Sequence, residues 1–347
     1  MTDRAAPPDR DDALLLVGDI GGTKTDLAVV SARKGPRHRL AYRRYPSRDY
    51  ARLEDVVRAF RSEFDVLEVE AACFDVAGPV VGGTAQLTNL PWQLDEAALA
   101  RDLGLRHAWL VNDLVATAAA VPLLRPDELD VVQDGAAQPG GAIAVLAPGT
   151  GLGEAFLTLD GDGYRPQASE GGHAAFSPAG QLELELLRHL WRRFEHVSVE
   201  RVASGIGIPN VYEFLRDERG IAESPALAGR LNGAEDRTHP ILEAAVDPES
   251  PDPLARATVD LFLQVLGTEA ANLALKVLAT GGIYLAGGIA QRLCERLPAS
   301  GFLDALRRSG RFRSTLERVP VAVVRGEVAL LGAASVGLRL SAGSRVR

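Results

Sequence analysis

Apolar and polar residues are distributed along this chain in blocks that predict an α/β fold. Apolar runs on both sides of a glycine-rich turn predict a β-hairpin at the start, whereas charged stretches with apolar positions every three to four residues predict helices. The first half is thus expected to contain strands at 14–17, 27–30, 39–45, 69–76 and 108–111, and helices at 51–64, 95–103 and 114–124.

The second half begins in the same way, with apolar runs at 142–147 and 155–159 flanking another glycine-rich turn. This echo suggests two related halves facing one another. The stretch from 216 to 253 is rich in proline, glycine and charge, and we interpret it as loop with short helices. Asp252 and Pro253 form an N-cap followed by proline at the first helical position. They predict a long helix that ends near Thr280, followed by a strand at 283–286.

Length and composition narrow the class of protein. A chain of 347 residues suggests about two domains, and a net charge of −8 argues against a broad nucleic-acid surface. Cys73 and Cys294 are too few for a disulfide scaffold or a cysteine zinc cluster. No apolar run approaches the roughly 20 residues that cross a bilayer. Residues 1–12 lack the apolar stretch of a signal peptide, and we interpret them as a disordered tail. Together, these features predict a soluble cytoplasmic protein without membrane or nucleic-acid partners.

The first glycine-rich turn, Gly18-Asp19-Ile20-Gly21-Gly22-Thr23-Lys24-Thr25, nearly matches a Walker loop. Thr23 replaces the expected glycine, and a strand follows where a Walker loop continues into a helix. We therefore interpret it as a hairpin turn whose backbone amides approach phosphate oxygens. Asp19 beside it is suited to orient a hydrated magnesium ion. The alternative is a hairpin turn without a ligand.

Two further segments carry candidate phosphate and proton chemistry. Gly149-Thr150-Gly151-Leu152-Gly153 lies between two apolar runs and can serve as a second phosphate turn, although a purely structural turn is the alternative. Asn112-Asp113 ends a buried strand, where ligands of α/β folds commonly bind. A carboxylate there can accept a proton from a hydroxyl that attacks a phosphoryl group. Asp113 could instead, or in addition, cap the following helix.

Glu170-Gly171-Gly172-His173 combines a carboxylate and an imidazole around two glycines, which suits hydrogen bonds to neighbouring hydroxyls of a polyol. Too few metal-ligating residues surround it for a metal site. Glu200 alone would be an ordinary surface residue. Asp75 interrupts an apolar strand, and the sequence offers no physical reason for it.

Taken together, these segments resemble the bacterial glucokinases of the hexokinase and actin-like ATPase superfamily. The resemblance spans roughly Leu14 to Gly332 and keeps the order of the family's motifs. It rests on the two turns, on Asn112-Asp113 and on Glu170–His173. Four further segments also match: Val76-Ala77-Gly78-Pro79-Val80, Thr88-Asn89-Leu90-Pro91-Trp92, Glu200–Gly205 and Leu285-Ala286-Gly287-Gly288.

The resemblance implies an actin-like (ribonuclease H-like) ATPase fold with a sugar and ATP cleft between two domains. The small α/β domain would be 13–124 plus a returning helix at about 327–341, and the large one 125–326. Family members are commonly homodimers. The cleft closes on the sugar and excludes water that would otherwise accept the phosphoryl group.

The resemblance also implies the reaction, which is ATP-dependent phosphorylation of the glucose 6-hydroxyl. Asp113 would be the general base. The substrate-binding residues would be Asn89, Asn112, Asp113, Glu170, His173 and Glu200. The ATP-binding residues would be Gly18, Asp19, Ile20, Gly21, Gly22, Thr23, Gly149, Thr150, Gly151, Gly287 and Gly288, with Asp19 holding Mg²⁺ through water.

One residue departs from the family's pattern, because Lys24 stands where many glucokinases carry Asn. In this it is similar to the related repressor–kinase (ROK) sugar kinases. Those hold zinc through a cysteine-rich motif near their histidine, and neither cysteine here is near His173 in the sequence. A kinase for another hexose or with another phosphoryl donor, and a non-catalytic sugar sensor, are the alternative functions.

Overall fold

The computed structural model describes residues 12–64, 68–87 and 90–343, which divide into two compact units. The first unit extends to Leu124 and includes Asp160–Ala168 and the chain from Glu327 onward, whereas the second comprises Arg125–Leu159 and Ser169–Gly326. The expected division did not assign residues 160–168 to the first unit. Asn89 and residues 1–11 of the expected tail lie outside the described residues. Asp12, the last residue of that tail, accepts a hydrogen bond from the Arg33 amide (3.1 Å).

A mixed sheet with the strand order β3-β2-β1-β4-β8 forms the centre of the first unit. Strands β1, β2 and β3 are an antiparallel meander, while β4 and β8 run parallel to β1. The expected hairpin is present, with Ile20 opposite Thr25. The strands are β1 (Leu14–Ile20), β2 (Lys24–Ser31), β3 (Arg39–Pro46), β4 (Ala71–Val76) and β8 (His107–Asn112).

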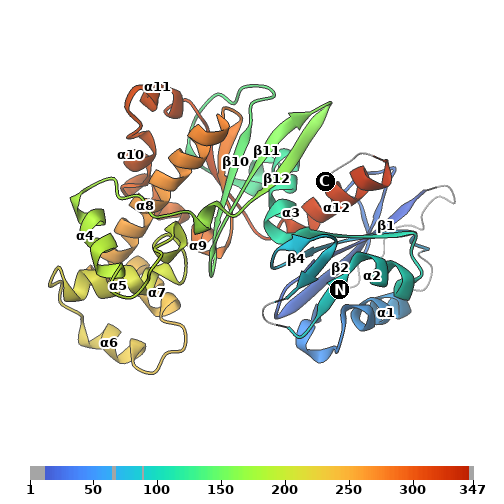
Figure 1. Cartoon of the computed structure of the whole chain (residues 1–347), viewed down its shortest axis with the longest axis horizontal. Coiled ribbons are helices and arrows are strands. Elements are labelled where there is room, and N and C mark those ends of the chain that lie inside the picture. The colour runs from blue at the N-terminus through green and yellow to red at the C-terminus, as the bar shows by residue number, and fades with distance from the viewer. Residues whose placement is uncertain (1–11, 65–67, 88–89, 344–347) are drawn as a thin grey trace. The chain divides into compact units, whose positions relative to one another are not determined.

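Helices cover the two faces of this sheet. α1 (Leu53–Glu63) buries the apolar positions that its periodicity predicted. α2 (Glu96–Leu103) is capped by Asp95 and ends at Gly104, whose φ of 66° needs glycine. α12 (Ala329–Ser341) lies beside α3 (Asp113–Ala120) and strands β1 and β4 (Figure 1), so the end of the chain completes the core of the first unit.

The sequence pattern missed a small antiparallel sheet, β5-β6-β7, between β4 and α2. Its strands are β5 (Val80–Val81), β6 (Thr84–Gln86) and β7 (Gln93–Asp95). They are two or three residues long, which is too short for an alternating pattern to be recognisable.

The second unit is built on strands of a sheet with the order β12-β11-β10-β13-β14-β9, of which the edge strand β12 falls, except for Ser169, among the residues grouped with the first unit. Its part β12-β11-β10-β13-β14 repeats the order of the first sheet: a central strand pairs with an antiparallel hairpin partner on one side and parallel strands on the other. The expected relation between the two halves is confirmed at this level. The strands are β9 (Leu129–Gln133), β10 (Ile143–Pro148), β11 (Leu152–Asp160), β12 (Gly163–Ser169), β13 (Gly282–Leu285) and β14 (Val321–Val324).

Helix α8 (Pro253–Val277) organises the second unit by packing against β10 and against helices α5, α7 and α10. Asp252 caps it as expected, accepting a hydrogen bond from the Ala255 amide (2.9 Å). It ends three residues earlier than predicted, where Leu278 adopts a left-handed conformation (φ 52°). The other helices are α4 (Gln181–Leu190), α5 (Gly207–Asp217), α6 (Pro225–Leu231), α7 (Thr238–Val246), α9 (Gly288–Arg292), α10 (Phe302–Arg307) and α11 (Arg313–Leu316). None of the helices in the described chain combines the length and apolar composition needed to cross a membrane.

Candidate active site

The first glycine-rich turn joins β1 to β2 and is held by its own backbone and by Ser47. The Gly21 amide donates to the Lys24 carbonyl (2.9 Å), and the Ser47 hydroxyl donates to the Gly21 carbonyl (2.7 Å). Gly18 lies earlier, inside β1, where a Cβ atom would be 2.8 Å from the side chains of Leu27 and Phe74. Packing alone therefore accounts for glycine at position 18.

Lys24 forms an ion pair with Glu327, just before α12. Glu327 also accepts a hydrogen bond from Arg44 (2.9 Å), which in turn binds both carboxylate oxygens of Asp26 (2.8 Å each). Lys24 thus belongs to an ionic network that connects the first hairpin to the C-terminal segment of the same unit.

Asp19 occupies the end of β1, opposite Asp26 on one neighbouring strand and Asp75 on the other. Burial, reinforced by the negative charge of Asp26, raises the pKa of Asp19 to about 6. A nearby cation stabilises the ionised form of a carboxyl group in such surroundings, and carboxylate oxygens are ligands that Mg²⁺ prefers. The donor type and its position beside the turn therefore fit a magnesium ion held directly or through water.

Asp75, which the sequence left unexplained, is fully buried in β4. Neither of its carboxylate oxygens has a hydrogen-bond partner among the described residues. Burial and the charges of Asp19 and Asp113 raise the pKa of Asp75 well above its usual range. A proton on Asp75 turns it into a donor toward Asp19. Asp75 is thus a buried carboxyl group whose raised pKa favours the protonated form, near Asp19 and Asp113 of the same unit.

Asn112, rather than Asp113, is the N-cap of α3. Its side-chain oxygen accepts hydrogen bonds from the amides of Leu114 (3.0 Å) and Val115 (3.3 Å), and its side-chain nitrogen donates to the Gly78 carbonyl (3.0 Å). The capping role proposed for Asp113 is therefore corrected. Asp113 is the first residue of the helix and accepts from the Leu114 amide (2.8 Å).

The second unit brings three of the expected sugar-binding residues together. His173 lies with Nε2 at 3.8 Å from Glu170 Oε2 and with Nδ1 at 3.8 Å from Glu200 Oε1. Glu170 and His173 are exposed, whereas the Glu200 side chain is only 16% exposed. Two carboxylates and an imidazole at this spacing offer several acceptors, and a donor, to the vicinal hydroxyls of a sugar.

The second glycine-rich turn connects β10 to β11 and is held by backbone hydrogen bonds from residues that follow Glu200. The Gly205 amide donates to the Gly149 carbonyl (2.8 Å), and the Ile206 amide donates to the Thr150 carbonyl (3.1 Å). Gly287, with φ 85°, adopts a conformation that favours glycine. A Cβ there would be 3.0 Å from the Pro148 carbonyl, so the strand end of β10 and the start of α9 approach closely.

A cavity of about 320 Å³ in the second unit is lined by Gly149, Thr150 and Gly288. Two segments that the sequence assigned to ATP therefore converge on one pocket, although Gly151 and Gly287 are not among its lining residues. The rest of the lining was not predicted. It comprises Gly205, Ile206, Asp236, Thr238, His239, Leu242, Ile289 and Arg292. Its combination of apolar and polar side chains is typical of a small-molecule site.

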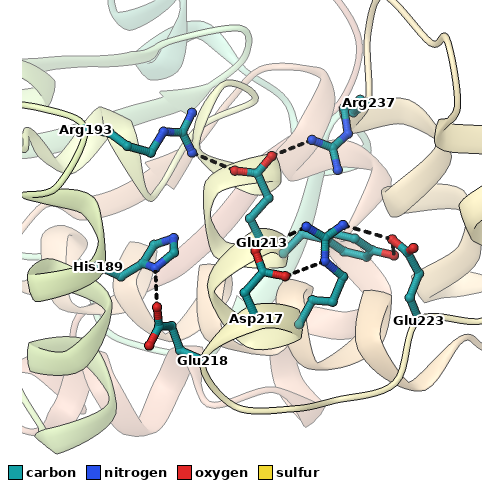
Figure 2. A network of polar contacts seen from close by, with 9 residues as sticks. His189, Arg193, Glu213, Asp217, Glu218, Glu223 and Arg237 are labelled. Atoms are coloured by element: carbon teal, nitrogen blue, oxygen red, sulfur yellow. Dashed lines mark hydrogen bonds and ion pairs between the residues drawn. The ribbon is translucent and has the colours of Figure 1, made fainter.

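The wall of this cavity at 236–239 is held by an ionic network (Figure 2). Glu213 of α5 accepts hydrogen bonds from Arg193 (2.6 Å) and Arg237 (2.5 Å), and Figure 2 shows it between the two guanidinium groups. The Thr238 hydroxyl donates to the Gly205 carbonyl (2.8 Å). This wall lies in the stretch interpreted as loop, where no sequence motif indicated a binding role.

Comparison with known proteins shows which family has these features. The family model described as Glucokinase matches residues 16–339. The glucokinase of Nostoc punctiforme is 41% identical over 340 residues, covering 94% of this chain and 99% of its own length. The chain belongs to the glucokinase family.

Solved structures agree with this family membership. A crystal structure of a glucokinase from an Antarctic psychrotroph superposes with a TM-score of 0.79 at 30% identity, covering 93% of this chain and 98% of its own. A ROK family glucokinase from Streptomyces griseus, in complex with glucose and AMPPNP, shares the fold with a TM-score of 0.61 at 21% identity, over 94% of this chain and 99% of its own. The resemblance to glucokinases and the actin-like ATPase fold class are thus confirmed.

Proposed function

We propose that this chain catalyses the transfer of the γ-phosphoryl group of ATP to the 6-hydroxyl of glucose, with Asp113 as general base. The enzyme class rests on the match to curated glucokinases over nearly the whole chain. The observation that carries the ATP site is the single cavity lined by Gly149, Thr150 and Gly288. The Streptomyces griseus neighbour, which holds glucose and an ATP analogue, supports the same pair of substrates.

Each proposed residue has one task in this reaction. Asp113 accepts the proton of the 6-hydroxyl as that oxygen attacks the γ-phosphorus and ADP leaves. Glu170, His173 and Glu200 bind the other hydroxyls and fix the sugar's orientation. Asn112 orients the start of α3, and with it Asp113, through its hydrogen bonds to the helix amides and to the Gly78 carbonyl.

The phosphates of ATP are bound by backbone amides. In this proposal the turn at Gly21, Gly22 and Thr23 presents the amides of Gly22 and Thr23 to the phosphate oxygens, and the turn at Gly149 and Thr150 presents the Thr150 amide. The Gly21 and Gly149 amides donate within their own turns, to the carbonyls of Lys24 and Gly151 (2.9 Å each). Asp19 holds Mg²⁺, which neutralises the charge of the phosphate chain. The apolar side chains of Ile206, Leu242 and Ile289 provide the surface that a nucleoside base requires.

Replacing Asp113 by Asn tests the proposal. The amide keeps the size of the side chain and cannot take the proton, so kcat in a coupled assay with glucose and MgATP is expected to fall by about 10²–10⁴-fold. The affinity for glucose should stay near that of the wild type. Asp127→Asn, at an exposed position of the second unit, is the control. If a folded Asp113→Asn protein retains more than half of the wild-type kcat, Asp113 is not the general base. If the wild type phosphorylates another hexose in preference to glucose, the proposed substrate is wrong.

The proposal includes a homodimer and a cytoplasmic location. The homodimer follows from the family resemblance. The cytoplasmic location is supported by the free cysteines Cys73 and Cys294, which are compatible with a reducing compartment. Sedimentation velocity at micromolar concentration tests the dimer, which would give a species of twice the 36.9 kDa chain mass.

A further inference from the structure

Two acidic side chains are buried against each other in the second unit, and the reaction described above does not use them. Glu154 of β11 is 2% exposed and Glu269 of α8 is 5% exposed. One oxygen of each carboxyl group, Oε1, is buried without a hydrogen-bond partner among the described residues. Buried polar atoms nearly always have a partner, so this pair calls for an explanation.

A single proton satisfies both groups. Two carboxylates are acceptors only, whereas a protonated carboxyl group donates to an ionised one. Glu269 also has contacts on its own helix, since its Oε2 accepts from the Asn272 side chain (2.9 Å) and its Oε1 lies 4.0 Å from Lys276 Nζ. Burial, together with the neighbouring Glu269, raises the pKa of Glu154 to about 8, partly offset by Lys276.

The Glu154 carboxyl group also supports the sugar-binding loop. A Cβ on Gly171 would lie 2.0 Å from Glu154 Oε2, so the backbone of Gly171 rests directly on this oxygen. Gly171 lies between Glu170 and His173, and its amide donates to the Ser169 hydroxyl (3.0 Å). Any movement of the Glu154 side chain therefore displaces the segment that carries two of the proposed sugar ligands.

We propose that Glu154 is a positioning residue for the sugar-binding loop 170–173, and that it holds the loop through a proton shared with Glu269. This inference rests on the proposed function, because it takes Glu170 and His173 as glucose ligands. Loss of the proton leaves two negative charges in a buried space, and their repulsion moves Glu154 against Gly171. The site thus binds glucose best when Glu154 is neutral.

The direction of the pH effect follows from the groups around Glu154. Helix α8 contributes Glu269, Asn272 and Lys276, the end of β12 contributes Ser169, and the loop itself carries Glu170 and His173. Because the pKa of Glu154 is raised to about 8, the shared proton is increasingly lost as pH rises through this value. The KM for glucose is therefore expected to rise as pH increases from 7 to 9.5, whereas the KM for ATP stays nearly constant.

Glu154→Gln and Glu154→Leu test this assignment. The Gln amide donates to Glu269 at every pH, so this variant should keep the wild-type KM for glucose at pH 7 and show no alkaline rise. Leu removes the carboxyl group that donates to Glu269 and supports Gly171, which should weaken glucose binding at least about fivefold at pH 7 with kcat at saturating glucose retained. Glu183→Gln, which alters another buried carboxylate of the same unit, should keep the wild-type pH profile.

Calorimetric glucose titrations at pH 7 and 9.5 separate the two proposals. No glucose binding by the wild type at either pH would mean that the proposed function is wrong. Glucose binding that is equally tight at both pH values, or an alkaline loss that persists in Glu154→Gln, would overturn the role of Glu154 alone. Equal losses in kcat and in both KM values for Glu154→Leu would show a general structural defect and would also overturn it.

Discussion

The Leu152 amide donates a hydrogen bond to Oε2 of Glu200 (3.0 Å), although 48 residues separate the two in sequence. Leu152 belongs to the second glycine-rich turn, Gly149–Gly153, and Glu200 lies beside His173. One hydrogen bond therefore ties the proposed sugar-binding group to the proposed phosphate-binding turn. The two proposed substrate sites of this unit thus share one structural support.

Substituting Gly151 should disturb both sites at once. A Cβ at this position would lie 2.4 Å from Glu200 Oε2, so Gly151→Ala forces the carboxylate away from the Leu152 amide and from the sugar. We expect glucose affinity without nucleotide to fall about tenfold, because a charge-assisted hydrogen bond contributes about 1.5–3 kcal/mol. Glucose titration by calorimetry measures this effect.

Gly149→Ala provides the comparison. Nothing lies within 4 Å of a Cβ at position 149, although this residue lines the cavity. This variant should raise the KM for ATP and leave glucose affinity unchanged. Similar loss of glucose affinity in both variants would contradict the specific link between Gly151 and Glu200.

Local sequence patterns were sufficient for the parts of the site that lie within one segment. Glu170 and His173 are three residues apart, and each phosphate turn is a short connection between two recognisable strands. The N-cap of α3 shows the limit of this reasoning. Asn112 and Asp113 are both good capping residues, and only the backbone geometry of the helix start decides that Asn112 caps it.

Contacts between distant segments could not be predicted. The surroundings of Asp75 are set by the register of three strands, and those of Glu154 include a residue of α8 more than 100 positions away in the sequence. The cavity wall at 236–239 forms because Thr238 reaches Gly205 and Arg237 reaches Glu213. No periodicity or motif in one segment encodes such pairings, since they arise when separate elements pack together.

The network around Glu213 predicts a selective effect on ATP. Glu213→Gln keeps the side-chain size and removes the charge that holds Arg237 and Arg193 (Figure 2). The wall at 236–239 then loses the ion pair that holds it in place, and we expect the KM for ATP to rise about fivefold. Charge-assisted hydrogen bonds of this kind contribute about 1.5–3 kcal/mol, and hydrogen bonds to water replace part of that contribution. The KM for glucose should not change. Steady-state kinetics with each substrate varied in turn provide the measurement.

Glu218→Gln is the matched control for this network. Glu218 binds Arg192 (2.5 Å) and His189 (3.3 Å), and none of these three residues lines the cavity. Its replacement should leave both KM values near those of the wild type. If Glu218→Gln raises the KM for ATP as much as Glu213→Gln does, the network acts on the whole unit rather than on the wall at 236–239.

Asp75 predicts a pH-dependent difference in stability between the wild type and Asp75→Asn. Burial and the charges of Asp19 and Asp113 raise the pKa of Asp75 well above the ordinary aspartate value of 3.8, which applies to the unfolded chain. Folding therefore retains a proton that the unfolded chain releases, so the contribution of Asp75 to stability is complete below pH 4 and declines as pH rises toward the folded-state pKa. Asn is neutral at every pH and lacks this decline. Thermal melting at pH 4.5, 6 and 8 should show Asp75→Asn gaining in melting temperature over the wild type as pH increases. Melting temperatures that differ by the same amount at all three pH values would mean that Asp75 is ionised in the folded protein.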